Sequence, residues 1–319
     1  MPPIVYARGA MPPRLRARLE TDFETAFGVE LSDPEGWLRA EGPCVTGLAN
    51  ASFAPLGAPE MDLMPNLRII AGFGVGYDMI DVAAARARGI VVTHTPGVLD
   101  SDVANLGLLL LLAASRDLIR ADAHVRSGQW ATSGPLPLTR TIEGATVGIV
   151  GLGRIGRRLA EKLGAFGCEI RYHGRRAQTD VPWTFEPDLM ALARDARALI
   201  LCLPGGPGTD GLIGAKVLDA LGPEGILVNI ARGSVVDEPA LVAALAEGRL
   251  GAAGLDVFAT EPQVTEALRR LPNVVLSPHM ASATVETRTA MADLVADNLA
   301  DFFATGRART PVPECRDMV

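Results

Sequence analysis

The feature that most constrains this chain is a glycine-rich turn near its middle. The segment Gly151-Leu-Gly153-Arg-Ile-Gly156 follows an apolar stretch that ends at Val150, and it opens a stretch with helical spacing. Glycines at these positions allow a tight turn, close approach of a pyrophosphate to the backbone, and close packing of the helix on the strand. The N–H groups at the start of that helix favour an anion. The motif therefore predicts a dinucleotide site, the alternative being a purely structural turn. The site would use Gly151, Gly153, Arg154 and Ile155.

Strands and helices alternate on both sides of this turn. After it, apolar strands are expected at 168–172, 198–202, 226–230, 252–257 and 274–276, which together with 146–150 make a six-stranded doubly wound sheet. Before it, strands at 4–6, 44–46, 67–71 and 90–92 alternate with helices over 14–24 and 79–88. This alternation predicts an α/β protein made of two Rossmann-like domains, each a doubly wound parallel sheet.

The end of the chain suggests that one of these domains is discontinuous. The stretch Asp100-Ser-Asp102 can cap a helix expected over 103–118, and the last helix, expected over 285–304, follows the completed second sheet. We expect this last helix to cross back to the first domain. The first domain is therefore predicted to comprise residues 1–98 and 286–319, and the dinucleotide-binding domain residues 99–285.

Composition excludes several classes of protein. The formal net charge is −7 and the pI about 5.2, whereas a nucleic-acid binder normally carries a basic stripe. The longest apolar run, 106–114, is too short to span a bilayer, and the first residues show no basic region followed by an apolar core. The four cysteines are scattered without ligand spacing, so we expect free thiols and no metal site. These features predict a soluble, cytoplasmic protein that binds neither nucleic acid nor membranes.

The residues that follow the second strand of the dinucleotide domain indicate which cofactor it takes. An NAD enzyme places a carboxylate there, on the ribose hydroxyls, but this chain reads Tyr172-His-Gly-Arg-Arg176, and Asp180 lies well past the position. Two guanidinium groups suit a 2′-phosphate, which arginine can bind with two hydrogen bonds. We therefore predict NADPH/NADP in preference to NADH, at Gly174, Arg175 and Arg176. The alternative is that both arginines are solvated surface residues.

Three side chains with complementary chemistry follow later strands. Arg232, Glu261 and His279 each come after a predicted strand of the second sheet, where ligands of doubly wound sheets bind. An arginine can bind an anionic substrate and polarise its carbonyl, and a histidine can give a proton to the developing alkoxide. A carboxylate orients that imidazole. Taken singly, each has an ordinary explanation as a surface charge or a core histidine; together they predict reduction of a 2-keto acid.

These segments and others also carry a resemblance. The chain resembles the D-isomer-specific 2-hydroxyacid dehydrogenase family almost from end to end. The residues after the second strand and Ser282-Ala-Thr284 are similar to those of the NADP-dependent glyoxylate/hydroxypyruvate reductases within it. Asn105 departs from the acidic residue of many relatives. The segments that carry the resemblance are Gly72-Phe-Gly-Val-Gly-Tyr-Asp78, 148–156, 201–204, 229–233, 255–258 with Glu261-Pro262, and Pro278-His279.

The resemblance implies roles by position. Arg232 would bind substrate, Glu261 would tune His279, and His279 would be the acid/base, bordering both substrate and cofactor. Val75 and Gly76 would hold the substrate carboxylate through their backbone N–H groups, the alternative being a purely structural turn, and the active site would lie in the cleft between the two domains. Asp256 would lie near the nicotinamide amide, although a buried structural role fits it nearly as well. Other residues at the cofactor would be Leu203, Pro204, Ile230, Ala231 and Ala281.

The expected function is NADPH-dependent reduction of a small 2-keto acid of the glyoxylate/hydroxypyruvate type. The hydride would come from the nicotinamide and the proton from His279, with NADH a weaker cofactor. The resemblance also implies a homodimer, in which Trp130 would reach the neighbouring active site, unless it is a plain interface or core residue. The alternatives are a dehydrogenase of another 2-hydroxy acid, such as an aromatic one or phosphoglycerate, and a non-catalytic dinucleotide-sensing protein.

Overall fold

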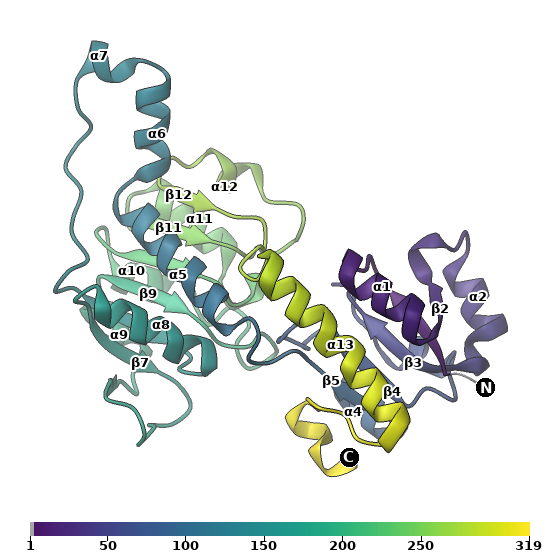
Figure 1. Ribbon diagram of the computed structural model, residues 1–319. Helices are drawn as coiled ribbons and strands as arrows, with labels where there is room; N and C mark the ends of the chain where they lie inside the picture. Colours follow the sequence, from purple (N-terminus) through teal and green to yellow (C-terminus); the bar gives the residue numbers. More distant parts are fainter. Residues whose placement is uncertain (1–2) are drawn as a thin grey trace. The chain divides into compact units, whose positions relative to one another are not determined.

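The computed structural model of this protein describes residues 3–319 (Figure 1). Residues 1 and 2, the first of those in which the sequence shows no basic region followed by an apolar core, lie outside the described residues. The chain divides into two compact units: residues 1–99 with 282–319, and residues 100–281. Each unit has its own parallel sheet, so the prediction of two Rossmann-like α/β domains is confirmed. Leu99 and residues 282–285, expected in the dinucleotide-binding domain, group with the first unit.

The first unit is built on a five-stranded sheet in the order β2-β1-β3-β4-β5, with every pair of neighbours parallel. Its strands are β1 (Ile4–Arg8), β2 (Glu24–Phe27), β3 (Val45–Asn50), β4 (Ile69–Gly72) and β5 (Val91–Thr93). Its helices are α1 (Pro13–Asp22), α2 (Pro34–Glu41), α3 (Ala58–Asp62), α4 (Val82–Ala87) and α13 (Val285–Thr305). The inner strands are buried on both faces, as parallel sheets usually are.

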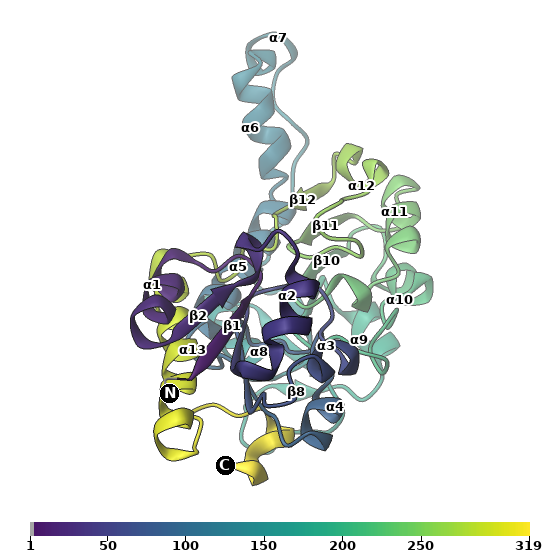
Figure 2. The same cartoon turned by 90° about the vertical axis from the view of Figure 1, so that its right-hand side faces the viewer.

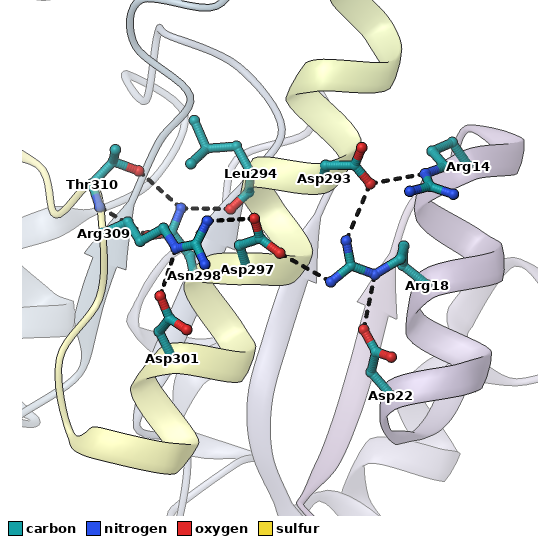
Figure 3. Close-up of polar contacts among 10 residues, drawn as sticks. All are labelled: Arg14, Arg18, Asp22, Asp293, Leu294, Asp297, Asn298, Asp301, Arg309 and Thr310. Atoms are coloured by element: carbon teal, nitrogen blue, oxygen red, sulfur yellow. Dashed lines mark hydrogen bonds and ion pairs between the residues drawn. The ribbon is translucent and has the colours of Figure 1, made fainter.

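Helix α13 completes this unit although it comes from the other end of the chain. Val295, Leu299 and Phe302 are buried in the same core as the strands. Helices α1 and α13 lie side by side, joined by ion pairs between arginines of α1 and aspartates of α13 (Figure 3). The first unit is therefore discontinuous in sequence, with its last helix packed into a core that residues 3–99 begin.

Several expected boundaries in the first unit were wrong. The helix expected over 14–24 ends at Asp22, because Phe23 adopts an extended backbone and the chain then enters β2, a fifth strand that the sequence reading missed. The helix expected over 79–88 begins only at Val82, where the Asp81 side chain accepts the Ala84 N–H and caps it. Strand β3, expected at 44–46, extends to Asn50.

The second unit is built on a seven-stranded parallel sheet in the order β12-β11-β10-β9-β6-β7-β8. Its strands are β6 (Thr146–Val150), β7 (Glu169–His173), β8 (Thr184–Phe185), β9 (Ala198–Leu201), β10 (Ile226–Asn229), β11 (Ala252–Leu255) and β12 (Val274–Leu276). Its helices are α5 (Asp100–Ser115), α6 (Leu118–Arg126), α7 (Gln129–Ser133), α8 (Arg154–Ala165), α9 (Leu189–Asp195), α10 (Ala215–Leu221), α11 (Glu238–Ala246) and α12 (Glu266–Arg270). The order reverses direction between β6 and β9, the position where doubly wound sheets bind ligands.

Two predictions for this unit were wrong in detail. The sheet has seven strands rather than six, because the two-residue strand β8 pairs with β7 and is too short to leave a hydrophobic pattern. The helix expected over 103–118 begins at Asp100, inside the segment expected to cap it, and ends at Ser115. Asp117 then adopts a left-handed backbone, with φ of 51°, and α6 begins at Leu118.

Helices α6 and α7 extend away from the seven-stranded sheet of their own unit (Figures 1 and 2). No residue of either helix is buried. Trp130, on α7, is 61% exposed. Within residues 3–319, no helix combines the length and the apolar character needed to cross a membrane.

Candidate active site

The glycine-rich turn joins β6 to α8. Gly151 has a φ of 96°, a conformation that L side chains rarely adopt, and a Cβ on Gly156 would lie 2.3 Å from the carbonyl oxygen of Gly151. A Cβ on Gly153, by contrast, would meet nothing within 4 Å. Gly153 precedes the first residue of α8 and faces open space, so a pyrophosphate can approach the N–H groups that begin this helix. The residues present therefore fit a dinucleotide.

The chain after β7 lies beside this turn. Val150 and His173 pair at the ends of β6 and β7, and the Gly151 N–H donates to the His173 carbonyl at 2.9 Å. The Gln178 side chain then donates to the Leu152 carbonyl at 2.7 Å, while its backbone N–H donates to the Tyr172 hydroxyl at 2.7 Å. The loop that carries Arg175 and Arg176 is thereby held against the glycine-rich turn.

The first carboxylate that follows β7 in the sequence already forms an ion pair. Asp180 pairs with Arg157 on the first turn of α8, at 2.7 Å, and the hydrogen bond from Arg157 lowers the pKa of that carboxyl. Arg175 and Arg176 are both exposed. In the part of the chain that the structure describes, neither guanidinium is paired with a carboxylate. The ribose end of the predicted site therefore presents positive charge.

The side chain of Arg154 also forms an ion pair. Its Nε donates to Asp100 at 2.8 Å, and Asp100 is largely buried at the start of α5. The guanidinium of Arg154 thus joins the glycine-rich turn to α5. Arg154 remains a candidate cofactor-binding residue through its backbone N–H, one of the unpaired groups at the start of α8.

The catalytic candidates and several cofactor candidates follow strands of the seven-stranded sheet, and these strands end in register. Asn229 pairs with Leu201 and with Leu255, and Leu255 pairs with Leu276, so β9, β10, β11 and β12 end at one edge of the sheet. The residues just beyond these ends include all three catalytic candidates and the candidate cofactor residues Leu203, Pro204, Ile230, Ala231, Asp256 and Ala281.

His279 and Glu261 form a close pair at this edge. The Nδ1 atom of His279 lies 2.7 Å from Oε2 of Glu261, and the other carboxylate oxygen accepts the Phe258 N–H at 2.9 Å. His279 has a φ of 47°, in the left-handed region that few non-glycine residues adopt. A residue held in this way occurs often at functional sites.

The surroundings of Glu261 keep its carboxyl ionised. Burial raises the pKa of Glu261, but the hydrogen bond from His279 lowers it, as do the Phe258 N–H and the charges of His279 and Arg232. The lowering effects prevail, so the pKa of Glu261 lies below its ordinary value. An ionised Glu261 favours a proton on Nδ1 of His279 and fixes the orientation of the ring.

Asp256 holds the turn that carries His279. Its carboxylate accepts the Met280 N–H at 2.9 Å, the Ala281 N–H at 3.0 Å and the Ser277 hydroxyl. Burial raises the pKa of Asp256 against the opposing effect of these three bonds. Both carboxylate oxygens therefore accept bonds within the chain, as the structural role requires, and the contact with the nicotinamide amide stays a prediction.

Arg232 is positioned by a turn after β10. The Asn229 side chain donates to the Arg232 carbonyl at 2.9 Å and accepts the Ala231 N–H at 3.0 Å. The Arg232 guanidinium donates to the Ala231 carbonyl at 2.7 Å, and the side chain is half-buried. Asn229 is 1% exposed, so the arginine extends from a rigid support.

In the first unit, Val75 and Gly76 follow β4. The Thr95 N–H donates to the Gly74 carbonyl at 2.8 Å, and Nδ1 of His94 lies 3.0 Å from the Val75 carbonyl. The sequence reading missed His94 and Gln178 as residues that hold these loops. Their bonds join positions distant along the chain, and a single sequence carries no signal for such pairings.

A parallel sheet with a glycine-rich turn at its reversal point, and with an Arg–Glu–His set beyond its strand ends, defines a dinucleotide-dependent oxidoreductase. Residues 108–281 match the model of the D-isomer specific 2-hydroxyacid dehydrogenase NAD binding domain. The chain is 43% identical, over 94% of its length and 95% of the relative's, to 2-ketogluconate reductase of Gluconobacter oxydans. It is 44% identical, over 86% of its length and 88% of the relative's, to hydroxyphenylpyruvate reductase of Plectranthus scutellarioides.

A solved structure is similar over nearly the whole chain. It is an NADPH-dependent glyoxylate/hydroxypyruvate reductase of Sinorhizobium meliloti in complex with NADP and malonate, with 45% identity, a TM-score of 0.91 and coverage of 98% of both chains. The protein described here belongs to the D-isomer specific 2-hydroxyacid dehydrogenase family. The resemblance found in the sequence is thereby confirmed.

Proposed function

We propose that this protein reduces a small 2-keto acid of the glyoxylate/hydroxypyruvate type to the 2-hydroxy acid, with NADPH as the preferred cofactor. The observation that carries the proposal is the 2.7 Å pair of His279 and Glu261, at the same sheet edge as Arg232 and in the same unit as the glycine-rich turn. The test is a steady-state assay of NADPH oxidation with a panel of 2-keto acids.

Each catalytic candidate has one task in this proposal. Because Nδ1 of His279 is bonded to Glu261, Nε2 is the nitrogen that gives a proton to the substrate oxygen. Arg232 binds the carboxylate and keto oxygen with its guanidinium, and the backbone N–H groups of Val75 and Gly76 also hold the carboxylate. A bound nicotinamide would supply the hydride. Glu261 stabilises the imidazolium before the transfer and keeps the ring oriented after it.

The preference for NADPH is supported by the charges after β7. Arg175 and Arg176 are exposed beside the glycine-rich turn, and Asp180, the first carboxylate beyond them, is occupied by Arg157. A 2′-phosphate is negatively charged, and the guanidinium groups of two arginines can bind it through paired hydrogen bonds. The Sinorhizobium reductase, which shares the fold over 98% of this chain, is NADPH-dependent.

Replacing Arg175 with aspartate is expected to reverse the cofactor preference. The carboxylate would repel a 2′-phosphate and accept hydrogen bonds from the ribose hydroxyls of NADH, so kcat/KM for NADPH should fall about 10–100-fold relative to NADH, for a loss of about 1.5–3 kcal/mol. The measurement is kcat/KM for both cofactors at one fixed 2-keto acid concentration. Arg194→Asp, an exposed arginine on α9, is the matched control and should leave the ratio unchanged. Equal kcat/KM values for both cofactors in the unmodified protein would refute the preference.

A second candidate function is the reduction of a larger 2-keto acid. Relatives named 2-ketogluconate reductase and hydroxyphenylpyruvate reductase are nearly as similar to this chain as the glyoxylate/hydroxypyruvate reductase. Arg232, His279, Val75 and Gly76 would act on the carboxylate and keto groups, which all these acids share. A panel that includes a sugar-derived and an aromatic keto acid separates the candidates by kcat/KM.

We also propose that the protein is a homodimer formed through α6, α7 and the segment that follows them. Apolar side chains are exposed along this stretch, and contiguous exposed apolar residues mark interaction surfaces. They are Leu118, Ile119, Val125, Trp130 and Leu138. Sedimentation equilibrium should give twice the 33.5 kDa chain mass. A mass of one chain at micromolar concentration would remove the dimer and the role of Trp130 in a neighbouring site. A cytoplasmic location stays a prediction from the cysteine pattern.

A further inference from the structure

The loop after β4 has its backbone fixed by two neighbouring residues of the segment after β5. The Thr95 N–H donates to the Gly74 carbonyl at 2.8 Å. The next carbonyl, of Val75, lies 3.0 Å from Nδ1 of His94. A carbonyl oxygen can only accept a hydrogen bond, so Nδ1 of His94 must carry the proton and donate it.

These two bonds determine where the next two N–H groups point. In a planar trans peptide the C=O and N–H directions are opposite. The Gly74 carbonyl shares its peptide with the Val75 N–H, and the Val75 carbonyl shares its peptide with the Gly76 N–H. Both carbonyls bind residues 94–95, so both N–H groups point away from that segment. In residues 3–319, neither N–H donates a hydrogen bond within the chain.

Successive N–H groups that point to one side form a concave site for an anion. We propose that His94 is a positioning residue for substrate binding, whose Nδ1–H bond to the Val75 carbonyl orients the N–H groups of Val75 and Gly76 toward the substrate carboxylate. The inference rests on the proposed function for the identity of that anion. In this role His94 acts through the loop that it orients.

His94 is held in turn by the C-terminal segment of the same unit. The Thr310 hydroxyl donates to the His94 carbonyl at 2.6 Å, and the His94 N–H donates to the Thr310 carbonyl at 3.2 Å. Asn298, fully buried on α13, donates from its side-chain amide to the Thr310 hydroxyl at 2.8 Å and accepts the Thr310 N–H at 2.9 Å (Figure 3). Thr310, itself held by Asn298 of α13, thus fixes the backbone that carries the His94 ring.

The ring also has a packing partner. Tyr77 meets the His94 imidazole edge to face, with ring centroids 5.4 Å apart. Burial, with the nearby Glu314 carboxylate, raises the pKa of Tyr77 to about 12, so the phenol keeps its proton and donates it to Glu314. The loop is therefore held by contacts at residues 74, 75 and 77. Of these three contacts, only the one at Val75 depends on a hydrogen-bond donor in the side chain at position 94.

Two substitutions distinguish the effect of the Nδ1 hydrogen-bond donor from the effect of the aromatic ring. His94→Phe keeps an aromatic ring against Tyr77 and removes the donor. His94→Asn removes the ring and places an amide N–H close to the position of Nδ1. We expect the phenylalanine variant to raise KM for glyoxylate about 10-fold, the effect of one lost hydrogen bond, with kcat and the Kd for NADPH unchanged. The asparagine variant should restore most of the wild-type KM, and Thr310→Val should raise KM by a smaller factor.

Structures of the variants test the positioning role apart from any activity. A crystal structure of His94→Phe should show the Val75–Gly76 peptide rotated or in two orientations, and that of His94→Asn should show the wild-type orientation. An unchanged peptide in His94→Phe would overturn the inference, as would equal KM values for the phenylalanine variant and the wild type. Equal impairment of both variants would show that ring packing matters instead. Wild-type protein inactive on every 2-keto acid would contradict the proposed function, while the crystal structures would still decide the role of His94.

Discussion

Replacing His279 with asparagine is expected to lower kcat for 2-keto acid reduction about 10²–10⁴-fold, the contribution of a positioned acid or base. Asparagine suits this position because it tolerates the left-handed backbone, here with φ of 47°. Its amide can still donate to Glu261, but it has no group where Nε2 of the imidazole stands. The measurement is kcat from NADPH oxidation at saturating 2-keto acid.

The control for this variant is cofactor binding. Because His279 follows the turn that Asp256 holds and pairs with Glu261, its replacement should leave the glycine-rich turn intact, so the Kd for NADPH and the Tm should stay close to the wild-type values. A large loss of kcat with intact NADPH binding would assign the proton transfer to His279. A variant with nearly wild-type kcat would show that the proton comes from another group.

Replacing Arg232 with glutamine is expected to lower kcat/KM for the 2-keto acid about 10²–10³-fold. The loss of one partner of a hydrogen-bonded charge pair costs about 2–5 kcal/mol. Glutamine retains a donor near the Ala231 carbonyl, which Arg232 binds at 2.7 Å, so the turn after β10 should survive. Steady-state kinetics over a range of 2-keto acid concentrations give kcat and KM separately.

Arg232→Lys is a control for which an intermediate loss of kcat/KM is expected. Lysine keeps the positive charge but loses the planar fork that binds a carboxylate with two hydrogen bonds, so its kcat/KM should lie between the wild-type and glutamine values. The Kd for NADPH should be the same in all three proteins. Equal kcat/KM for the glutamine variant and the wild type would exclude Arg232 from substrate binding.

The regular part of the fold is predictable from the sequence because hydrophobic runs and glycine turns are local signals. Helix α13 begins at the expected residue 285, and β6 occupies the expected residues 146–150. Strand β2 was missed because Glu24 and Thr25 extend the polar pattern of the helix before it. Strand β8 has two residues, fewer than any periodic pattern needs.

The candidate site likewise contains residues that the sequence predicts and residues that it does not. Arg232, Glu261 and His279 could be found because each follows a strand, and strands that end in register bring their loops to one edge. The partners that hold the loops could not be found in this way. Asp256 bonds Met280 and Ala281, and His94 bonds Val75, through contacts that only the folded backbone specifies. For Asp256 the structure shows the bonds of the structural role, which the sequence had left open beside the contact with the nicotinamide amide.

We expect the Arg–Glu–His set and the dinucleotide site to act together on a 2-keto acid. The most direct measurement follows NADPH oxidation by the purified protein with glyoxylate, hydroxypyruvate, pyruvate, a sugar-derived keto acid and an aromatic keto acid, each repeated with NADH. We expect oxidation that depends on added 2-keto acid, with the highest kcat/KM for glyoxylate or hydroxypyruvate with NADPH. Tight NADPH binding with no turnover of any of these acids would contradict it and would instead indicate a protein that senses the dinucleotide.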